Sequence, residues 1–235
     1  MSFHFLNGTT SDAYADTGPG KIIVDRGASV QTNTAATDAL SLSSGPWTIL
    51  VDGAVGASFG DAIDLGGTGA FVSNITLGKH AVLTSPNMFG IGINASHAAN
   101  ITNAGIVTGV LAGIGETGDG NFRIENLKSG DIGGGIYGID VESSGTHIII
   151  NAGNISGPIA IRSQSGIEHV TNFGTLEGDV DLGGGNDAFT NFKKVGKVIK
   201  HGVVTGEIDL GAGNDRFNGG NRAETVKDGD GEDVI

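Results

Sequence analysis

The sequence contains no cysteine, which excludes disulfide bonds and thiolate metal sites in this chain. Oxygen atoms are therefore the metal ligands that the composition favours. Only one tryptophan and two tyrosines are present, so few rings are available to stack against sugars. No stretch approaches about 18 uninterrupted apolar residues, and the first ten residues lack a basic start followed by an apolar core. The sequence thus predicts neither a membrane span nor a cleaved signal peptide.

Positive charge is also scarce. The 235 residues hold 13 lysines and arginines against 26 aspartates and glutamates, a formal net charge of −13. A chain of this sign repels phosphate backbones and anionic membrane surfaces and attracts cations. Twelve of the 26 acidic residues fall within residues 177–235, so we expect the C-terminal quarter to bind cations and we expect no nucleic-acid partner.

Glycine, in contrast, is abundant, with 43 copies, and the chain is built from repeats. Each repeat contains a short alternating segment, a turn around Asn-x-Gly and another short segment, with no helical period. Steps of 27, 26, 26, 23, 25, 21 and 28 residues separate the equivalent positions, which are Val24, Val51, Leu77, Asn103, Asn126, Asn151, Asn172 and Lys200.

Such repeats predict an all-β fold, a right-handed parallel β-helix or solenoid, because units of about 25 residues bury an apolar face only by stacking. Four of the equivalent positions are asparagine, namely Asn103, Asn126, Asn151 and Asn172. We expect them to share one corner of successive coils and to hydrogen-bond along the stack. A ligand-binding stripe along that corner is the alternative.

Two nonapeptides near the end of the chain are almost identical, DLGGGNDAF at residues 181–189 and DLGAGNDRF at residues 209–217. KDGDGEDVI at residues 227–235 is a third related unit. The unit at residues 218–226 departs from the shared motif at Arg222 and Glu224. These motifs resemble the hemolysin-type repeats of the repeats-in-toxin (RTX) family, Gly-Gly-x-Gly-x-Asp-x-apolar-x. The resemblance covers only the C-terminal part and implies a calcium-bound β-roll.

The spacing predicts how these acids stack. Asp187 and Asp215 are 28 residues apart, which is one coil, and Asp215 and Asp233 are 18 apart, which is two nine-residue half-turns. We expect a ladder of carboxylates with calcium between its rungs, completed by carbonyls of tight glycine turns. The predicted ligands are Asp187, Asp215, Asp233, Gly183, Gly185, Gly211, Gly213, Gly229 and Gly231. Solvated acids on plain glycine turns are the alternative, and in either case Phe189 and Phe217 are expected to anchor the core.

These observations predict three regions. Residues 1–20 form an N-terminal cap or irregular segment, residues 21–206 form the β-helix coils, and residues 207–235 form an RTX-type β-roll, with a first calcium turn at 181–189. The last repeat stops at Ile235 in mid-unit, so we expect the parent protein to be longer. In the resembled family the export signal for type I secretion commonly lies at the far C-terminus.

The function predicted from the sequence is a secreted or cell-surface, extracellular calcium-binding solenoid, a structural or adhesin-like module whose C-terminal repeats fold on binding calcium. A surface glycan or another cell-surface protein is its expected partner. The alternative is a carbohydrate-active β-helix enzyme similar to polysaccharide lyases or epimerases. In that case Lys200, His201 and Arg162 would supply the base and the charge clamp. The fold alone does not decide between the two functions.

Overall fold

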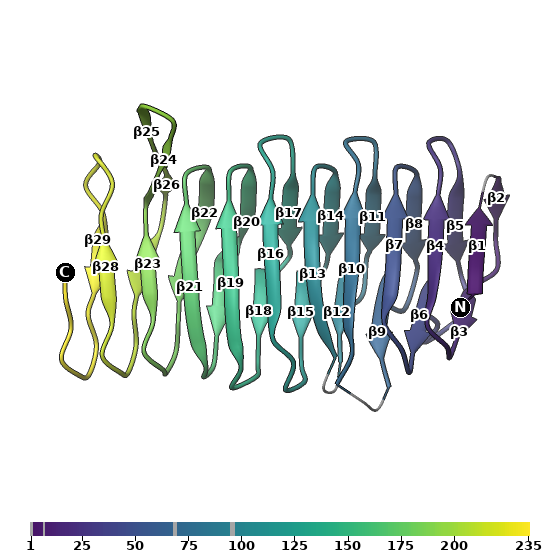
Figure 1. Ribbon diagram of the computed structural model, residues 1–235, viewed down its shortest axis with the longest axis horizontal. Helices are drawn as coiled ribbons and strands as arrows, with labels where there is room; N and C mark the ends of the chain where they lie inside the picture. Colours follow the sequence, from purple (N-terminus) through teal and green to yellow (C-terminus); the bar gives the residue numbers. More distant parts are fainter. Residues whose placement is uncertain (1, 7, 68–69, 95–96) are drawn as a thin grey trace.

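The chain folds into a parallel β-solenoid, seen in a computed structural model that describes residues 2–6, 8–67, 70–94 and 97–235 (Figure 1). The described residues form strands and turns and no helix, which confirms the all-β solenoid prediction. No helix among them is long and apolar enough to cross a membrane. The coils stack along the long axis, with the N- and C-terminal ends of the chain at opposite ends of the stack.

The first sheet runs the length of the stack and has one strand per coil, each paired in parallel with the next. Its ten strands are β1 (Ser2–Leu6), β4 (Gly20–Val24), β7 (Trp47–Val51), β10 (Val72–Leu77), β13 (Ala98–Asn103), β16 (Phe122–Asn126), β19 (Thr146–Asn151), β21 (Ile167–Asn172), β23 (Ala188–Thr190) and β28 (Arg216–Asn218).

The second sheet supplies the other walls of the coils and is also parallel. Its strands are β2 (Thr9–Thr10), β3 (Tyr14–Asp16), β5 (Ser29–Thr32), β6 (Leu40–Ser43), β8 (Ala54–Ala57), β9 (Ile63–Gly66), β11 (Val82–Ser85), β12 (Ile91–Ile93), β14 (Ile106–Gly109), β15 (Ala112–Glu116), β17 (Asp131–Gly134), β18 (Tyr137–Val141), β20 (Asn154–Ser163), β22 (Thr175–Asp181), β26 (Val203–Val204), β27 (Glu207–Asp209) and β29 (Thr225–Lys227). Both ends of the chain therefore pair into the same two sheets as the middle.

The core lies between these walls and consists of equivalent inward-facing positions stacked from coil to coil. Alternate residues of each first-sheet strand point inward, so the register stacks one apolar column through the molecule. That column contains Ile22, Ile49, Ile75, Ile101, Ile124, Ile149, Val170, Phe189 and Phe217, all buried. The rings of Phe189 and Phe217 stack with their centroids 5.8 Å apart, which confirms both as core anchors.

A second column marks the corner at which the first-sheet strands end, and it confirms most of the repeat alignment. The register pairs seven of the eight predicted positions in succession, from Val24 to Asn172. The eighth, Lys200, is wrong, because Asn191 accepts the next hydrogen bond, from Asn172, instead. The physical reason is an inserted antiparallel hairpin, β24 (Phe192–Val195) and β25 (Val198–His201), which separates Asn191 from the Gly202 that completes its turn.

The asparagines of this corner form a continuous hydrogen-bonded ladder, as predicted. Each side-chain Nδ2 donates to the Oδ1 of the asparagine one coil further on, at 2.8–2.9 Å, and all are fully buried. The members are Asn103, Asn126, Asn151, Asn172 and Asn191. Asn191 in turn donates to Glu224 Oε1 at 2.9 Å. This bond gives Glu224 a role in the ladder and explains why its nonapeptide has glutamate in place of the usual aspartate. Because the amides are buried and bonded to one another, their observed role is to hold the stack together.

Candidate metal centre

The glycine turns at the C-terminal end repeat one backbone conformation three times. Gly183, Gly211 and Gly229 have φ of +74°, +92° and +88°, in the left-handed region that favours glycine. Two residues later in each turn, φ is +147° to +149°, at Gly185, Gly213 and Gly231. A side chain on any of the six would also collide with a backbone carbonyl of the preceding coil. Glycine is therefore needed here both for conformation and for close stacking.

The register places the three predicted aspartates on successive rungs. Ala188 pairs with Arg216, and Arg216 pairs with Val234, so the residues that precede them stack in one column. The backbone N–H of Asp187 donates to Asp215 Oδ1 at 2.7 Å, and that of Asp215 donates to Asp233 Oδ1 at 2.8 Å. The carboxyl ladder expected from the 28- and 18-residue spacings is thus present in the fold.

One further rung, Glu168, was missed from the sequence. Its backbone N–H donates to Asp187 Oδ1 at 2.8 Å, so it continues the column one coil toward the N-terminus. Its side chain is fully buried, and neither carboxylate oxygen has a hydrogen-bond partner. Glu168 carries only part of the glycine motif: Gly166, two residues before it, has φ of +146°, like Gly185, Gly213 and Gly231, but no second glycine turn precedes it. Counting one coil, 19 residues, back from Asp187 leads to this Gly-x-acid pattern.

Burial dominates the electrostatics of this carboxyl column. Asp187 and Asp215 are each 2 % exposed, and each keeps one buried oxygen, Oδ2, without a partner. Burial, reinforced by the charge of Asp187, raises the pKa of Glu168 to about 8. Burial also raises the pKa of Asp187 to about 6, despite the hydrogen bond from the Glu168 amide, and it raises the pKa of Asp215. At neutral pH the column therefore favours a proton or a cation.

The donor set fits calcium in chemical kind, since buried carboxylate oxygens without partners are hard ligands. Among the described residues, no group of three or more acidic or histidine side chains could hold a metal ion by itself. Backbone carbonyls would have to complete the shell. Those of Gly183 and Gly211 already accept hydrogen bonds from Ala212 and Asp230, at 2.8 and 2.9 Å, and each retains a second lone pair. Metal ligation by the six glycines stays a prediction.

A second group of acids lies near the N-terminal half of the stack, beside a hollow of about 370 Å³. Burial raises the pKa of Asp61 to about 7 and that of Asp64 to about 6, in each case with Asp38 adding to the effect. Both carboxyls have partners, however. Asp61 Oδ1 accepts a hydrogen bond from the Phe89 N–H at 3.0 Å, and Asp64 accepts one from the Asn94 side chain. We therefore assign no cation site here.

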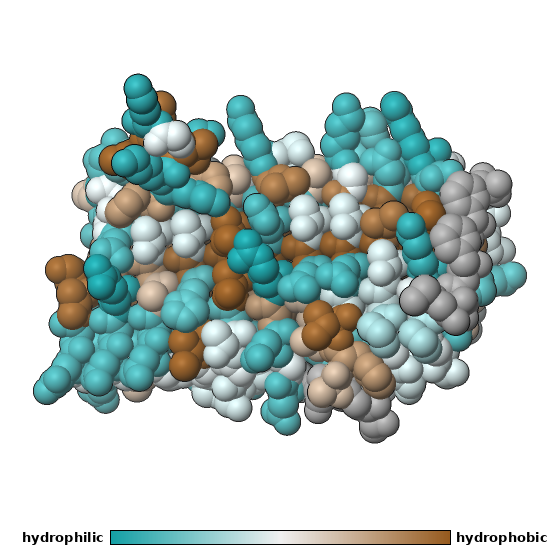
Figure 2. All heavy atoms as spheres, viewed as in Figure 1, coloured by the Kyte–Doolittle hydropathy of each residue, from teal (hydrophilic) through white to brown (hydrophobic). Residues whose placement is uncertain are grey.

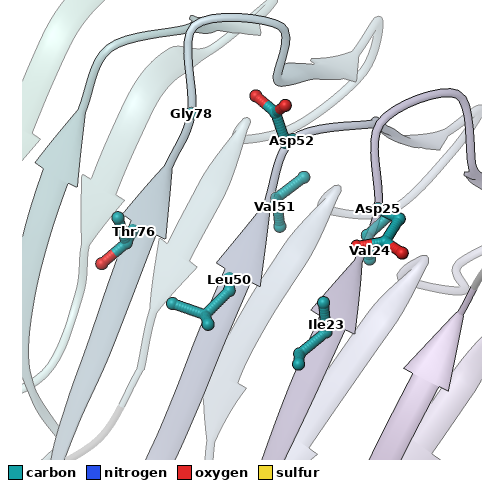
Figure 3. A pocket seen from close by; sticks show the side chains of 8 residues that line it. All are labelled: Ile23, Val24, Asp25, Leu50, Val51, Asp52, Thr76 and Gly78. Atoms are coloured by element: carbon teal, nitrogen blue, oxygen red, sulfur yellow. The ribbon is translucent and has the colours of Figure 1, made fainter.

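A shallow hollow of about 290 Å³ lies on the outer surface of β4, β7 and β10 (Figure 3). Ile23, Leu50 and Thr76 project from these neighbouring strands, and Asp52 stands at the corner above them. Asp52 Oδ2 lies 3.1 Å from His80 Nδ1, and the hydrogen bond from this ring lowers the pKa of Asp52. The acid is thus a stabilised carboxylate at a turn rather than a proton donor.

The residues considered for the enzymatic alternative lie on different elements. Arg162, on β20, donates to Asp140 Oδ1 at 2.6 Å, to Tyr137 Oη at 2.9 Å and to Glu142 Oε1 at 2.9 Å. Its guanidinium is therefore engaged in a network of its own. Lys200 and His201 belong to the β24–β25 hairpin, which projects from the stack in Figure 1. The fold does not assemble the three into one site.

Comparison with known proteins identifies no relative of this chain. No protein-family model and no curated protein matches this sequence, and no solved structure matches its fold. The chain is a parallel β-solenoid. Any function must be argued from its own geometry.

Proposed function

We propose that this protein is a secreted or cell-surface calcium-binding solenoid, a structural or adhesive module whose C-terminal repeats resemble RTX repeats. One observation carries the proposal. The carboxyls of Glu168, Asp187 and Asp215 are stacked in a column while buried, and they retain oxygens with no hydrogen-bond partner. Burying such groups is costly unless a cation or a proton accompanies them.

Calcium bound between rungs would supply the missing partner for these oxygens. It would remove the repulsion between adjacent carboxylates, so binding would stabilise the C-terminal coils. By the range for extracellular modules, the affinity is about 10⁻⁴ to 10⁻³ M per site. At low cytosolic calcium the last repeats would remain poorly folded, and they would order on export, with the free energy of binding contributing to that of folding.

Ordering of the end coils would extend the two sheets, whose outer faces form a long surface. Repeat proteins of this architecture use such surfaces for binding. A surface glycan or another cell-surface protein is the partner that we propose for it. The pattern of exposed Asn and Thr side chains on β10 and β13, such as Asn74 and Asn100, is compatible with hydrogen bonding to a polar polymer.

Calorimetric titration of calcium into EDTA-treated protein tests the proposal. We expect at least one ion to bind in the range of about 10⁻⁴ to 10⁻³ M. Asp215→Asn keeps the side-chain shape but removes the central charge of the column, and it is expected to weaken binding by about tenfold or more, since each contact to a charged group contributes about 1.5–3 kcal/mol. Glu168→Gln should weaken binding at the first rung in the same direction.

Asp119→Asn is the matched control, because this acid is exposed and lies at a turn two coils before Glu168, the first rung of the column. Its isotherm should superimpose on that of the unchanged protein. Absence of binding heat, together with an unchanged melting temperature in millimolar calcium, would mean that the glycine turns serve stacking alone.

A further inference from the structure

One corner of the solenoid carries most of its positive charge. The first-sheet strands end in one column of the stack, so the turns that follow them lie in a row along this corner. Seven of the 13 lysines and arginines stand in these turns, and we call them the basic corner: Arg26, Lys79, Lys128, Lys193, Lys194, Lys197 and Lys200. The acids of the same turns are Asp25 and Asp52, and the second is paired with His80.

Four of these lysines stand in the inserted hairpin. In three other coils the corner turn is Asn-x-Gly with a single central residue, namely Asn103-Ala-Gly105, Asn151-Ala-Gly153 and Asn172-Phe-Gly174. In the coil that follows Asn172, ten residues, 192–201, replace that residue. The turn still closes beneath them, because Gly202 N–H donates to Asn191 O at 3.0 Å. The stack does not need the hairpin for its own hydrogen bonds, and insertions of this kind commonly carry binding function.

The hairpin surface combines like charges with exposed aliphatic groups. The register sets Lys193 directly opposite Lys200, an unfavourable pair in the absence of an anion. Lys193 Nζ lies 4.9 Å from the centroid of the Phe173 ring, which anchors the base. Val195, Val198 and Ile199 are 45 %, 60 % and 52 % exposed. Figure 2 shows hydrophilic side chains reaching outward from the hairpin beside hydrophobic ones.

We propose that this hairpin docks on the surface of an anionic phospholipid bilayer. Lysines meet the headgroup phosphates, and the three aliphatic side chains enter the boundary between headgroups and acyl chains. The aromatic rings of the hairpin, Phe192 and His201, pair with each other at its base, and the residues beyond them, 193–200, read KKVGKVIK without a side-chain hydroxyl, amide or aromatic group. Sugars are bound through such groups, so the composition favours a lipid surface over a glycan.

The net charge of −13 opposes this docking for the chain as a whole, but the shape of the molecule limits that effect. Each strand of the hairpin has four residues and spans about 13 Å. The Debye length at physiological salt is about 8 Å. The tip therefore reaches a bilayer while the carboxylates of the body remain largely screened from it.

Vesicle flotation tests the inference, once in EDTA and once in millimolar calcium, which fills the proposed metal centre, and binding in either condition supports it. The probes are vesicles of phosphatidylcholine alone and of phosphatidylcholine with 30 % phosphatidylglycerol. We expect binding to the anionic vesicles only. A lysine near such a surface contributes roughly fivefold in partition, so Lys197→Gln with Lys200→Gln should weaken binding by roughly 20-fold. Val198→Ser with Ile199→Ser should weaken it severalfold at constant charge.

Two variants serve as controls. Arg216→Gln with Lys227→Gln removes the same charge from exposed positions on β28 and β29, outside the basic corner, and should alter partition by less than about twofold. Replacing residues 192–201 by one alanine restores the Asn-Ala-Gly turn of Asn151-Ala-Gly153. This variant should keep the circular dichroism spectrum and lose vesicle binding. Failure of the unchanged protein to float, equal binding by the shortened variant, or binding to polygalacturonate instead would each overturn the inference.

Discussion

In EDTA, the protein is expected to melt about 10 °C lower at pH 8 than at pH 5, and millimolar calcium is expected to recover at pH 8 the part of that loss that Glu168 and Asp187 of the carboxyl column cause. The cause is a set of buried carboxyls with raised pKa values, to about 8 for Glu168, about 7 for Asp61 and Glu116, and about 6 for Asp187. The order of the two melting temperatures would be opposite in a protein whose acids are stabilised as anions.

The sign follows from proton linkage. Between about pH 4 and pH 8 the folded state holds protons that the unfolded chain, with ordinary carboxyl pKa values near 4, has released. The free energy of unfolding therefore falls as pH rises through this window, and it is level below it. One pKa unit corresponds to about 1.4 kcal/mol, so the shift of Glu168 alone is expected to cost about 3–5 kcal/mol. For a chain of this length that corresponds to about 10 °C.

Calcium binding and the Glu168→Gln substitution separate the contribution of the carboxyl column to this pH dependence from the contributions of the other buried acids. The variant keeps a neutral side chain at the most strongly shifted position, so its melting temperature should fall less steeply with pH than that of the unchanged protein. Asp119→Asn should reproduce the unchanged profile. Thermal melts followed by circular dichroism between pH 4 and pH 9 measure all three. A melting temperature in EDTA that climbs from pH 5 to pH 8 would refute this account of the carboxyl column.

Asn151→Ala is expected to destabilise the protein by about 3–5 kcal/mol, because the amide side chain makes four hydrogen bonds in the buried ladder. Its Nδ2 donates to Asn172 Oδ1 and to the Thr175 carbonyl, both at 2.9 Å. Its Oδ1 accepts from Asn126 Nδ2 at 2.9 Å and from the Gly153 N–H at 3.2 Å. Truncation leaves a cavity and buried polar groups without partners.

Urea unfolding measures this loss, and Asn100→Ala provides the comparison. Asn100 is exposed and donates one hydrogen bond to Asn74 at 3.1 Å, so its truncation should cost no more than about 1 kcal/mol. Equal destabilisation by the two substitutions would mean that the ladder contributes nothing beyond ordinary surface hydrogen bonds.

The stacking of the coils could be predicted from the sequence, because each coil of a solenoid places similar residues in equivalent surroundings at a nearly constant spacing. The seven positions from Val24 to Asn172 end the same short alternating pattern, first with an apolar residue and then with asparagine, and the register pairs them. The last position was predicted wrongly because the hairpin sequence VIKHG resembles a repeat, while ten residues separate Asn191 from Gly202. The prediction relied on the local similarity of the hairpin sequence to a repeat, although the corner is defined by the hydrogen bonds of its asparagines.

The candidate metal centre was predictable only where glycine marks it. Asp187, Asp215 and Asp233 follow tight turns that recur in the sequence, and the structure stacks them. Glu168 has only half of this signature, the single Gly166 with φ of +146°, and its position in the column depends on the length of the coil between it and Asp187. Its burial, and the shift in pKa that follows, arise from tertiary packing that no local pattern encodes.

The asparagine ladder also has a direction. Every amide donates toward the C-terminal end of the stack, so the side-chain dipoles align head to tail and their positive end meets the carboxylate of Glu224. This arrangement resembles an anion placed at the amino end of an α-helix. Aligned bonds polarise one another, so the row acts as a single polar axis, and Glu224 terminates it as a counter-charge. The two ends of this solenoid are consequently electrically unlike, although its coils are nearly the same.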